Sequence, residues 1–322
     1  MKVVILDDYQ DAVRACGLLD KLRGHDVTIH RDTVKGVDAL AGRLKDAEAI
    51  VLIRQRTELS EELIERLPRL RLISQTAGVG SHIPMEACTR RKIAVTAGAA
   101  GNPSTVELTW ALILAAMRRI PAEMEGMKRG KWQVAPMGRI VHGKTLGVYA
   151  LGKIGGRVAQ LAKAFGMNIH AWGREATAER ARAEGFEMAK NREAFFESCD
   201  IVSIHLPLNK ATRGLVTLKD LARMKPDSLF VNTSRADIIE AGALVAALRA
   251  GRPGFAAVDV YEEEPVLGGQ HPLLRMDNVV CTPHLGYASY ETLKDYLGLA
   301  IDRVAAFAAG KPRDVVNPEA LA

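Results

Sequence analysis

The sequence predicts an α/β protein with two doubly wound parallel sheets, the second unit inserted into the first. Short apolar runs alternate with amphipathic stretches from the first residue onward, which is typical of parallel strands joined by helical crossovers. This alternation is lost over residues 126–143 and restarts at Thr145. The chain has 322 residues, which is too long for one typical core and sufficient for two domains.

The first unit begins with strand signals that are separated by helical patterns. A helix is expected over 12–22 and another over 60–67, where Ser60 is placed to cap the first turn. The strands are predicted at 3–6, 27–30, 49–53, 72–75 and 93–96.

A long apolar helix is predicted over 101–120. Asn102 is a suitable N-cap, Pro103 suits the first turn, and Glu107 lies near the positive end of the helix dipole. The segment that follows, 126–143, has no periodicity and contains Gly, Pro and Lys, so we expect a linker or an exposed arm.

The second unit repeats the alternation of strands and helices, and a final helix over 289–310 can return to the first unit. We therefore expect one domain from 1–100 plus 289–322 and an inserted domain over 101–288. Its strands are predicted at 146–150, 168–172, 201–206, 229–233, 256–260 and 279–282.

Composition narrows the functional class. The net charge of +6 favours anionic ligands, but basic and acidic residues are interleaved and aromatic residues make up only 5% of the chain, so nucleic-acid binding is not expected. The four cysteines have no metal-type or redox-type spacing, which indicates buried, reduced thiols in a cytoplasmic protein and no metal site. No apolar run reaches the roughly 20 residues that span a bilayer, so no membrane partner is expected.

The stretch TLGVYALGKIGG at 145–156 reads as a strand, a glycine-rich turn and a helix. In a dinucleotide-binding turn, the first glycine allows the tight turn, the second lets the backbone approach the pyrophosphate and the third lets helix and strand pack. Gly152 and Gly155 occupy the second and third positions, and Ala150 occupies the first. A methyl group there is acceptable if φ stays negative. A plain strand-to-helix corner is the alternative, but a strand before, a helix after and a second strand beyond favour a Rossmann-like cofactor site.

The next strand carries information about the cofactor. An acid at its end would bind the ribose 2′-hydroxyl of NAD, but here Gly173 and Arg174 follow the strand. An arginine at this place can pair with a 2′-phosphate, which favours NADP(H) over NAD(H). Glu175 complicates the interpretation, because its side chain could turn inward.

Three polar residues follow three strands of the predicted second sheet: Arg235, Glu264 and His284. Ligands of parallel sheets bind beyond the carboxyl ends of the strands, so the three side chains could meet at one rim. An imidazole can exchange the proton of a carbonyl or hydroxyl, a carboxylate aligns it, and a guanidinium holds a substrate carboxylate. Each residue alone is better explained as structural or solvated, but the set suits hydride exchange between a nicotinamide and a 2-keto acid.

The chain resembles the D-isomer-specific 2-hydroxyacid dehydrogenases, in particular enzymes similar to phosphoglycerate dehydrogenase and hydroxypyruvate reductase. The resemblance extends over essentially all of the sequence and is most specific in its last three motifs. The motifs are TAGVGSHIPMEA at 76–87, STVEL at 104–108, TLGVYALGKIG at 145–155, HLPLNKATRGL at 205–215, VNTSRADIIE at 231–240, AAVDVYEEEP at 256–265 and TPHLGYAS at 282–289.

This resemblance implies two Rossmann-like domains, with the dinucleotide-binding domain inserted into the substrate domain, and a homodimer. It implies Arg235, Glu264 and His284 as the catalytic residues. The backbone around Val79 and Gly80, with Arg54 nearby, would bind the substrate carboxylate. On the side of the NAD(P) cofactor, beyond the turn residues Ala150, Gly152 and Gly155, it points to Thr105, Lys153, Ile154, Arg174, Leu206, Thr212, Thr233, Asp259 and Gly286.

Two other functions stay open at this point. A dinucleotide-sensing corepressor or interaction protein on the same scaffold would bind reduced cofactor and turn over negligibly. A formate-type dehydrogenase would typically lack the carboxylate partner of the histidine, so Glu264 argues against it. The sequence does not identify the acid: glyoxylate, hydroxypyruvate, phosphoglycerate and bulkier keto acids all offer a carboxylate beside a carbonyl.

Overall fold

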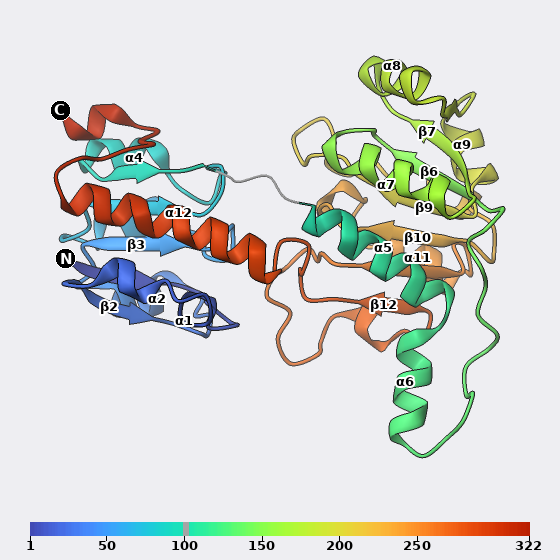
Figure 1. The fold of residues 1–322 in the computed structure, drawn as a ribbon, viewed down its shortest axis with the longest axis horizontal. Helices are drawn as coiled ribbons and strands as arrows, with labels where there is room; N and C mark the ends of the chain where they lie inside the picture. Colours follow the sequence, from blue (N-terminus) through green and yellow to red (C-terminus); the bar gives the residue numbers. More distant parts are fainter. Residues whose placement is uncertain (99–102) are drawn as a thin grey trace. The chain divides into compact units, whose positions relative to one another are not determined.

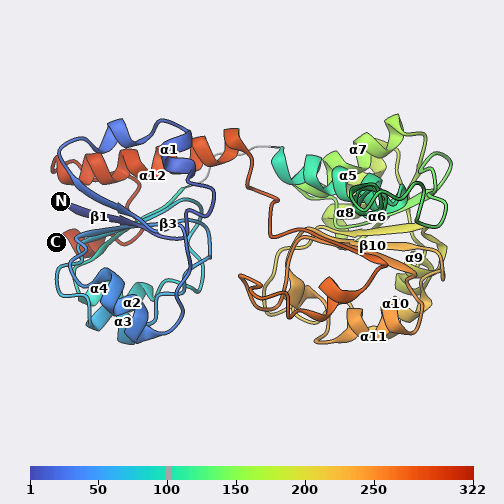
Figure 2. The same ribbon diagram turned by 90° about the horizontal axis from the view of Figure 1, so that it is seen from below.

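The computed structural model describes residues 1–98 and 103–322, and over these residues the chain forms two α/β units (Figure 1). One unit comprises Met1–Asn102 and Ala288–Ala322, and the other comprises Pro103–Tyr287. Each contains one sheet of parallel strands with helices on both faces (Figure 2). The predicted fold class is confirmed. The proposed cap Asn102 lies outside the described residues.

The first unit has a five-stranded sheet in the order β2-β1-β3-β4-β5, which is the flavodoxin-like order. Its central strand is apolar and fully buried, as expected for a sheet that is covered on both faces. The strands are β1 (Lys2–Ile5), β2 (Asp26–Ile29), β3 (Ala49–Leu52), β4 (Leu72–Gln75) and β5 (Ala94–Thr96).

Helices cover both faces of this sheet, with α1 and α12 on one face and α2, α3 and α4 on the other (Figure 2). Ser60 caps α3 as predicted, because its hydroxyl accepts a hydrogen bond from the Leu63 amide at 3.1 Å. The prediction of one helix over 12–22 is wrong, because Gly17 at φ +67° interrupts it. The helices are α1 (Ala12–Ala15), α2 (Val37–Leu44), α3 (Glu61–Glu65), α4 (Met85–Arg90) and α12 (Tyr290–Ala308), with 3₁₀ turns at Leu19–Leu22 and Pro318–Leu321.

The C-terminal segment is part of the first unit. Helix α12 lies against β4, where the Ser74 hydroxyl donates to the Ala300 carbonyl at 2.8 Å. The buried Arg303 donates to the Gln75 carbonyl at 3.2 Å, and Asn317 Oδ1 accepts a hydrogen bond from the Val95 amide at 2.7 Å. These contacts join the two ends of the sequence in one core.

The second unit has a seven-stranded sheet in the order β12-β11-β10-β9-β6-β7-β8. Numbered within the unit, this is the Rossmann order with one extra strand at the β12 edge. The short strand β8 has no counterpart in the sequence prediction. The strands are β6 (Thr145–Tyr149), β7 (Asn168–Trp172), β8 (Glu187–Met188), β9 (Ile201–Ile204), β10 (Leu229–Asn232), β11 (Phe255–Val258) and β12 (Val279–Cys281).

Helices α5, α7 and α8 cover one face of this sheet, and α9, α10 and α11 cover the other (Figure 2). Two apolar clusters fill the layers between helices and sheet. The helices are α5 (Ser104–Met117), α6 (Ile120–Lys128), α7 (Lys153–Ala164), α8 (Glu175–Glu184), α9 (Arg192–Ser198), α10 (Leu218–Arg223) and α11 (Ala243–Arg249), with 3₁₀ turns at Ala236–Ile238 and Pro272–Arg275.

The predicted helix over 101–120 is too long at its C-terminal end. Arg119 adopts a left-handed conformation at φ +57°, which ends α5 and starts α6 in a new direction. Helix α6 therefore occupies the start of the segment that was expected to be irregular. Residues 129–143 have no helix or strand and are mostly exposed, as predicted for an arm.

The burial of the cysteines agrees in part with the prediction. All four cysteines are free thiols; Cys88 and Cys199 are buried, whereas Cys16 and Cys281 are only half-buried, so the prediction of buried thiols is correct for two of them.

Within residues 1–98 and 103–322, no helix combines the length and apolar character that crossing a membrane requires.

Candidate active site and dinucleotide turn

The carboxyl ends of the parallel strands in the second unit lie at one edge of the sheet. Arg235 follows β10, Glu264 lies in the loop after β11, and His284 follows β12. The three strands are adjacent in the sheet. The topology therefore brings the three predicted catalytic side chains to the same rim.

Glu264 and His284 are in direct contact. Oε2 of Glu264 lies 2.5 Å from Nδ1 of His284, and Oε1 accepts a hydrogen bond from the Tyr261 amide at 2.9 Å. Burial acts to raise the pKa of Glu264, but the hydrogen bond and charge of His284, the Tyr261 amide and the charge of Arg235 together lower it. Glu264 is therefore held as a carboxylate, and the Nε2 edge of the imidazole points away from it.

Asp259 shapes the loop that presents His284. Its carboxylate is fully buried and accepts hydrogen bonds from the Thr282 hydroxyl at 2.6 Å and from the amides of Leu285 and Gly286 at 2.7 and 2.8 Å. Burial raises the pKa of Asp259 despite these donors. His284 has a left-handed φ of +54°, which is uncommon for a residue with a side chain and is held here by the surrounding hydrogen bonds.

Arg235 begins the turn after β10 and is anchored through its backbone. The Asn232 side chain donates to the Arg235 carbonyl at 2.9 Å, and Arg235 Nη1 donates to the Ser234 carbonyl at 2.7 Å. Its charge reaches Glu264 and contributes to the lowered pKa of that carboxyl. The guanidinium thus belongs to the same electrostatic group as the pair formed by Glu264 and His284.

The glycine-rich turn joins β6 to α7. Ala150 adopts φ +75°, so the condition under which a methyl group is readily accepted at this position, a negative φ, is not met. The turn is as tight as a glycine-based turn would be, and the Ala150 methyl group is accommodated at a conformational cost. The Ala150 amide donates to the Trp172 carbonyl at 2.8 Å, which fixes the turn against β7.

Gly152 and Gly155 serve different purposes in this turn. A Cβ at Gly155 would lie 2.1 Å from the Ala150 carbonyl oxygen, so only glycine fits between helix and strand. A Cβ at Gly152 would meet nothing within 4 Å, so the space above it is open to a ligand. In the described part of the chain, the amides of Lys153 and Ile154 donate to no acceptor. This helix start therefore has the donors and the open space that a pyrophosphate requires.

The residues that follow β7 bear on the choice between NAD(H) and NADP(H). Glu175 forms an exposed ion pair with Arg182 at 2.8 Å, so its side chain does not engage Arg174. Arg174 is exposed and has no ion-pair partner among the residues that the structure describes. A Cβ at Gly173 would lie 2.4 Å from the Thr177 hydroxyl, so an acid at that position would displace Thr177.

The other predicted cofactor residues lie on α5 and in the loops that follow β9, β10, β11 and β12. Thr105 on α5 donates to the Gly286 carbonyl at 2.7 Å, and the hydroxyls of Thr109 and Thr233 lie 2.8 Å apart. Thr212 is buried and donates to the Pro207 carbonyl at 2.6 Å, which uses its hydroxyl to hold its own loop. Leu206, which is half-buried, packs against the apolar cluster on the face covered by α9, α10 and α11.

The predicted substrate-binding residues form a group of their own in the first unit. Arg54 follows β3 with φ +58°, and its amide donates to the Thr76 hydroxyl at 2.9 Å. The amides of Val79 and Gly80, in the loop after β4, have no acceptor within the described ranges. A Cβ at Gly80 would lie 2.5 Å from the side-chain nitrogen of the exposed Gln55, so a larger residue there would require that side chain to move.

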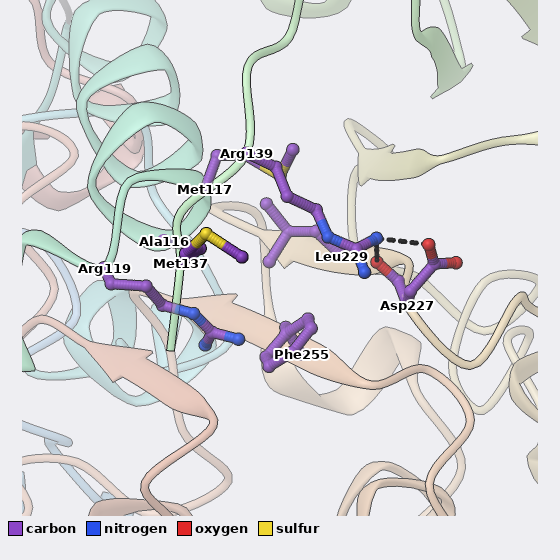
Figure 3. Close-up of a pocket in the computed structure, with 8 residues that line it drawn as sticks. All are labelled: Ala116, Met117, Arg119, Met137, Arg139, Asp227, Leu229 and Phe255. Carbon is purple, nitrogen blue, oxygen red and sulfur yellow. Dashed lines mark hydrogen bonds and ion pairs between the residues drawn. The ribbon is translucent and has the colours of Figure 1, made fainter. Parts of the chain in front are cut away.

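Figure 3 shows a small recess elsewhere in the second unit, between the end of α5, the arm and β11. The Arg119 guanidinium stacks 3.7 Å from the centre of the Phe255 ring, and Arg139 pairs with Asp227. None of the predicted site residues lines this recess. Over residues 1–98 and 103–322, no group of three or more His, Cys, Asp or Glu side chains is arranged to hold a metal ion.

Three residues of the second unit stand out in the structure that the sequence did not single out. The Tyr287 ring packs edge-on against His284 with ring centres 5.3 Å apart, and Tyr261 donates to the Thr282 carbonyl at 3.1 Å. Arg180 on α8 donates a hydrogen bond to the Leu151 carbonyl in the glycine-rich turn. Tyr287 and Tyr261 lie inside recognised motifs, which is a usable signal; Arg180 lies outside all of them.

A Rossmann sheet with a glycine-rich turn and a histidine–carboxylate pair at the same rim defines a nucleotide-dependent oxidoreductase. The comparisons with known proteins agree. Residues 110–286 match the family model described as D-isomer specific 2-hydroxyacid dehydrogenase, NAD binding domain. The chain belongs to the D-isomer-specific 2-hydroxyacid dehydrogenase family and is an oxidoreductase whose second unit binds NAD(H).

The chain is similar to family members with two different names. It is 39% identical over 295 residues to a glyoxylate reductase of Aeropyrum pernix, covering 88% of this chain and 87% of the relative. It is 38% identical over 260 residues to a D-3-phosphoglycerate dehydrogenase of Methanocaldococcus jannaschii, covering 80% of this chain but 49% of that protein. The chain thus spans about half the length of that second relative.

A solved structure shows the same architecture. The crystal structure of a phosphoglycerate oxidoreductase from Vibrio cholerae is 47% identical and superposes with a TM-score of 0.92, covering 96% of this chain and 99% of the other. These findings confirm the predicted family and the enzyme interpretation.

Proposed function

We propose that this protein transfers a hydride between NADP(H) and a small D-2-hydroxy acid or its 2-keto acid. The observation that carries this proposal is the contact of Glu264 with His284 at the rim of a sheet whose first turn suits a dinucleotide. A bound nicotinamide supplies or accepts the hydride at its C4 carbon.

His284 is the proposed acid and base. Its Nδ1 faces Glu264, so Nε2 is the nitrogen that exchanges a proton with the substrate oxygen. In the reducing direction Nε2 donates a proton to the carbonyl oxygen as the keto carbon gains the hydride; in the oxidising direction it removes the hydroxyl proton. The Glu264 carboxylate aligns the ring and stabilises its protonated form.

Two groups of residues are proposed to hold the acid. The Arg235 guanidinium binds the substrate carboxylate and polarises the adjacent carbonyl. In the first unit, the amides of Val79 and Gly80 together with Arg54 supply further donors for a carboxylate. The absence of another acceptor for these two amides within the described residues supports this assignment.

For the cofactor we propose a preference for NADP(H) over NAD(H). Arg174 is the proposed partner of the 2′-phosphate, since it has no ion-pair partner in the described ranges and Glu175 is engaged by Arg182. The amides at the start of α7 take the pyrophosphate. The other contacts with the cofactor are assigned to Thr105, Ile154, Leu206, Thr212, Thr233, Asp259 and Gly286.

Turnover distinguishes this function from the alternatives. The experiment is a panel of glyoxylate, hydroxypyruvate, 3-phosphohydroxypyruvate and a bulkier keto acid, each with NADPH and NADH, followed by absorbance of the reduced cofactor. We expect oxidation of NADPH with at least one acid, and faster than with NADH. Tight binding of reduced cofactor without oxidation by any acid would indicate a sensor. Reduction of NADP⁺ by formate would indicate a formate-type dehydrogenase.

Arg174→Met tests the cofactor preference. We expect it to weaken NADPH binding by about tenfold and to leave NADH binding unchanged, because a charge-assisted hydrogen bond contributes roughly 1.5–3 kcal/mol. Equal effects on both cofactors, or a strong preference of the unmodified protein for NADH, would contradict the proposal.

We also propose that the protein is a homodimer through α6 and the arm. This segment exposes large apolar side chains that a monomer would leave in water: Met124, Met127, Trp132, Met137 and Ile140. Trp132 is 77% exposed and Met137 is 95% exposed, so both are available to a partner. Sedimentation equilibrium of Trp132→Ser with Met137→Ser should show dissociation at concentrations where the unmodified protein is dimeric; Leu267→Ser, an exposed apolar residue outside this segment, is the control.

A further inference from the structure

The peptide group between Leu151 and Gly152, in the glycine-rich turn, is held by a side chain from another helix. Arg180 on α8 donates a hydrogen bond from Nη1 to the carbonyl oxygen of Leu151. Within residues 1–98 and 103–322, no backbone amide donates to this carbonyl. The side chain of Arg180 lies across Gly156, where a Cβ would be 3.7 Å from the arginine Cδ.

The carbonyl that Arg180 holds lies one residue after the strained position of the turn. Ala150 has φ +75°, a conformation that costs an L-residue with a Cβ roughly 1–2 kcal/mol and that glycine adopts freely. A turn with alanine at this position has more tendency to relax than one with glycine. A hydrogen bond to the next carbonyl opposes that relaxation, because the peptide group can then rotate only by losing its donor.

Fixing the Leu151 carbonyl also sets the direction of an amide. The peptide group is planar and trans, so its C=O and N–H point in opposite directions. With the Leu151 oxygen turned toward α8, the Gly152 N–H points away from α8. Neither that amide nor those of Lys153 and Ile154 has an acceptor among the described residues, and the space at Gly152 is open.

We propose that Arg180 is a positioning residue for the dinucleotide turn, and that it compensates for alanine in place of the first glycine. It acts through the Leu151 carbonyl, by holding the amides at the start of α7 in the direction from which they bind the pyrophosphate. This inference rests on the proposed dehydrogenase function. It assigns a role to a residue outside every recognised motif.

The role predicts a specific pattern of binding. The pyrophosphate is common to NADH and NADPH, so the loss of Arg180 weakens both cofactors by the same factor, whereas the loss of Arg174 affects NADPH alone. The reacting groups at Arg235, Glu264 and His284 are not touched, so kcat at saturating cofactor is retained while KM rises.

The test uses Arg180→Met, Arg180→Lys and the double variant Arg180→Met with Ala150→Gly in the full-length protein. Dissociation constants for NADH and NADPH are measured by fluorescence titration, with KM and kcat for each cofactor. We expect Arg180→Met to raise both dissociation constants about three- to tenfold, which is less than the full effect of a lost charge-assisted hydrogen bond because Arg180 acts on the turn and not on the dinucleotide itself. Lysine keeps a donor and should restore most of the affinity, and glycine at position 150 should restore part of it by removing the strain.

Lys163→Met is the matched control. Lys163 on α7 also joins the two helices through a carbonyl, since its Nζ donates to the Glu184 carbonyl at 2.6 Å, but at the opposite end of α7 from the turn. It should lower thermal stability about as much as Arg180→Met and leave both dissociation constants unchanged.

Several results would overturn the proposal. These are unchanged binding in Arg180→Met, a loss confined to NADPH, an equal loss in Lys163→Met, or no recovery with glycine at position 150. If Arg180→Met does not fold, the single variants Arg180→Lys and Ala150→Gly still test the proposal. We expect the Arg180→Lys variant to bind both cofactors slightly more weakly than the unmodified protein, and the Ala150→Gly variant to bind them at least as well. Failure of the unmodified protein to bind either dinucleotide would instead contradict the proposed function.

Discussion

Oε2 of Glu264 lies 2.5 Å from Nδ1 of His284, and its other carboxylate oxygen accepts the amide of Tyr261. The carboxylate is thus fixed at both ends, by backbone and by ring. The imidazole can present only its Nε2 edge to a ligand. This arrangement orients a proton donor without placing a second charge at the reacting atom.

Removing either member of this pair should greatly reduce turnover and leave cofactor binding intact. We expect His284→Ala and Glu264→Gln to lower kcat by roughly 10²–10⁴-fold, the usual contribution of a positioned general acid. Steady-state kinetics and a fluorescence titration with NADPH separate the two effects. Glu262→Gln is the control, since Glu262 lies in the same loop but pairs with His271. Near-normal rates in His284→Ala would reject the assignment.

The cofactor preference should respond to Gly173. Gly173→Asp introduces the acid that binds the ribose 2′-hydroxyl and repels a 2′-phosphate. Because a Cβ at position 173 would lie 2.4 Å from the Thr177 hydroxyl, the change should be made together with Thr177→Ala. We expect the ratio of kcat/KM for NADPH over NADH to fall by about tenfold or more. Thr177→Ala alone should leave the ratio unchanged; an unchanged ratio in the double variant would mean that this position does not select the cofactor.

The two glycines of the turn should fail in different ways. Gly155→Ala drives a methyl group to within 2.1 Å of the Ala150 carbonyl, so we expect a loss of about 1–3 kcal/mol of unfolding free energy. Gly152→Ala meets no atom within 4 Å and should unfold like the unmodified protein while binding dinucleotide more weakly. Urea unfolding and cofactor titration measure the two effects. Equal stability of both variants would contradict the packing role of Gly155, and full cofactor affinity in Gly152→Ala would argue against a ligand above the turn.

Stability should fall as the pH is lowered through the range in which histidines titrate. Burial lowers the pKa of His205 from 6.5 to about 4. Below about pH 6.5 the unfolded chain binds a proton that the folded state refuses, so the unfolding free energy decreases between pH 6.5 and 4 and is fully retained above that range. Urea unfolding at pH 8, 6 and 5 should show this slope. In His205→Gln, whose side chain can keep a hydrogen bond to the Ser203 hydroxyl, the unfolding free energy should depend less steeply on pH. An unchanged pH dependence would show that other groups cause the effect.

The positions of the strands along the chain were predictable because they follow from local patterns of apolar residues. Residues 49–53 and 201–204 are buried throughout, and a short, mostly apolar run of this kind is by itself the sequence signal of a buried parallel strand. Helix ends were less predictable. The breaks at Gly17 and Arg119 depend on single left-handed residues, and only the glycine can be anticipated from its residue type.

By itself, the sequence determined that two parallel sheets form, that a glycine-rich turn begins the second, and that an arginine, an acid and a histidine follow three of its strands. The tertiary structure alone decided how these parts meet. Contacts such as Arg180 with Leu151 and Glu264 with His284 join residues 29 and 20 positions apart. The positive φ of Ala150 likewise depends on its surroundings. Periodicity reports which face of an element is buried, whereas side-chain direction and backbone strain are fixed only when distant segments pack together.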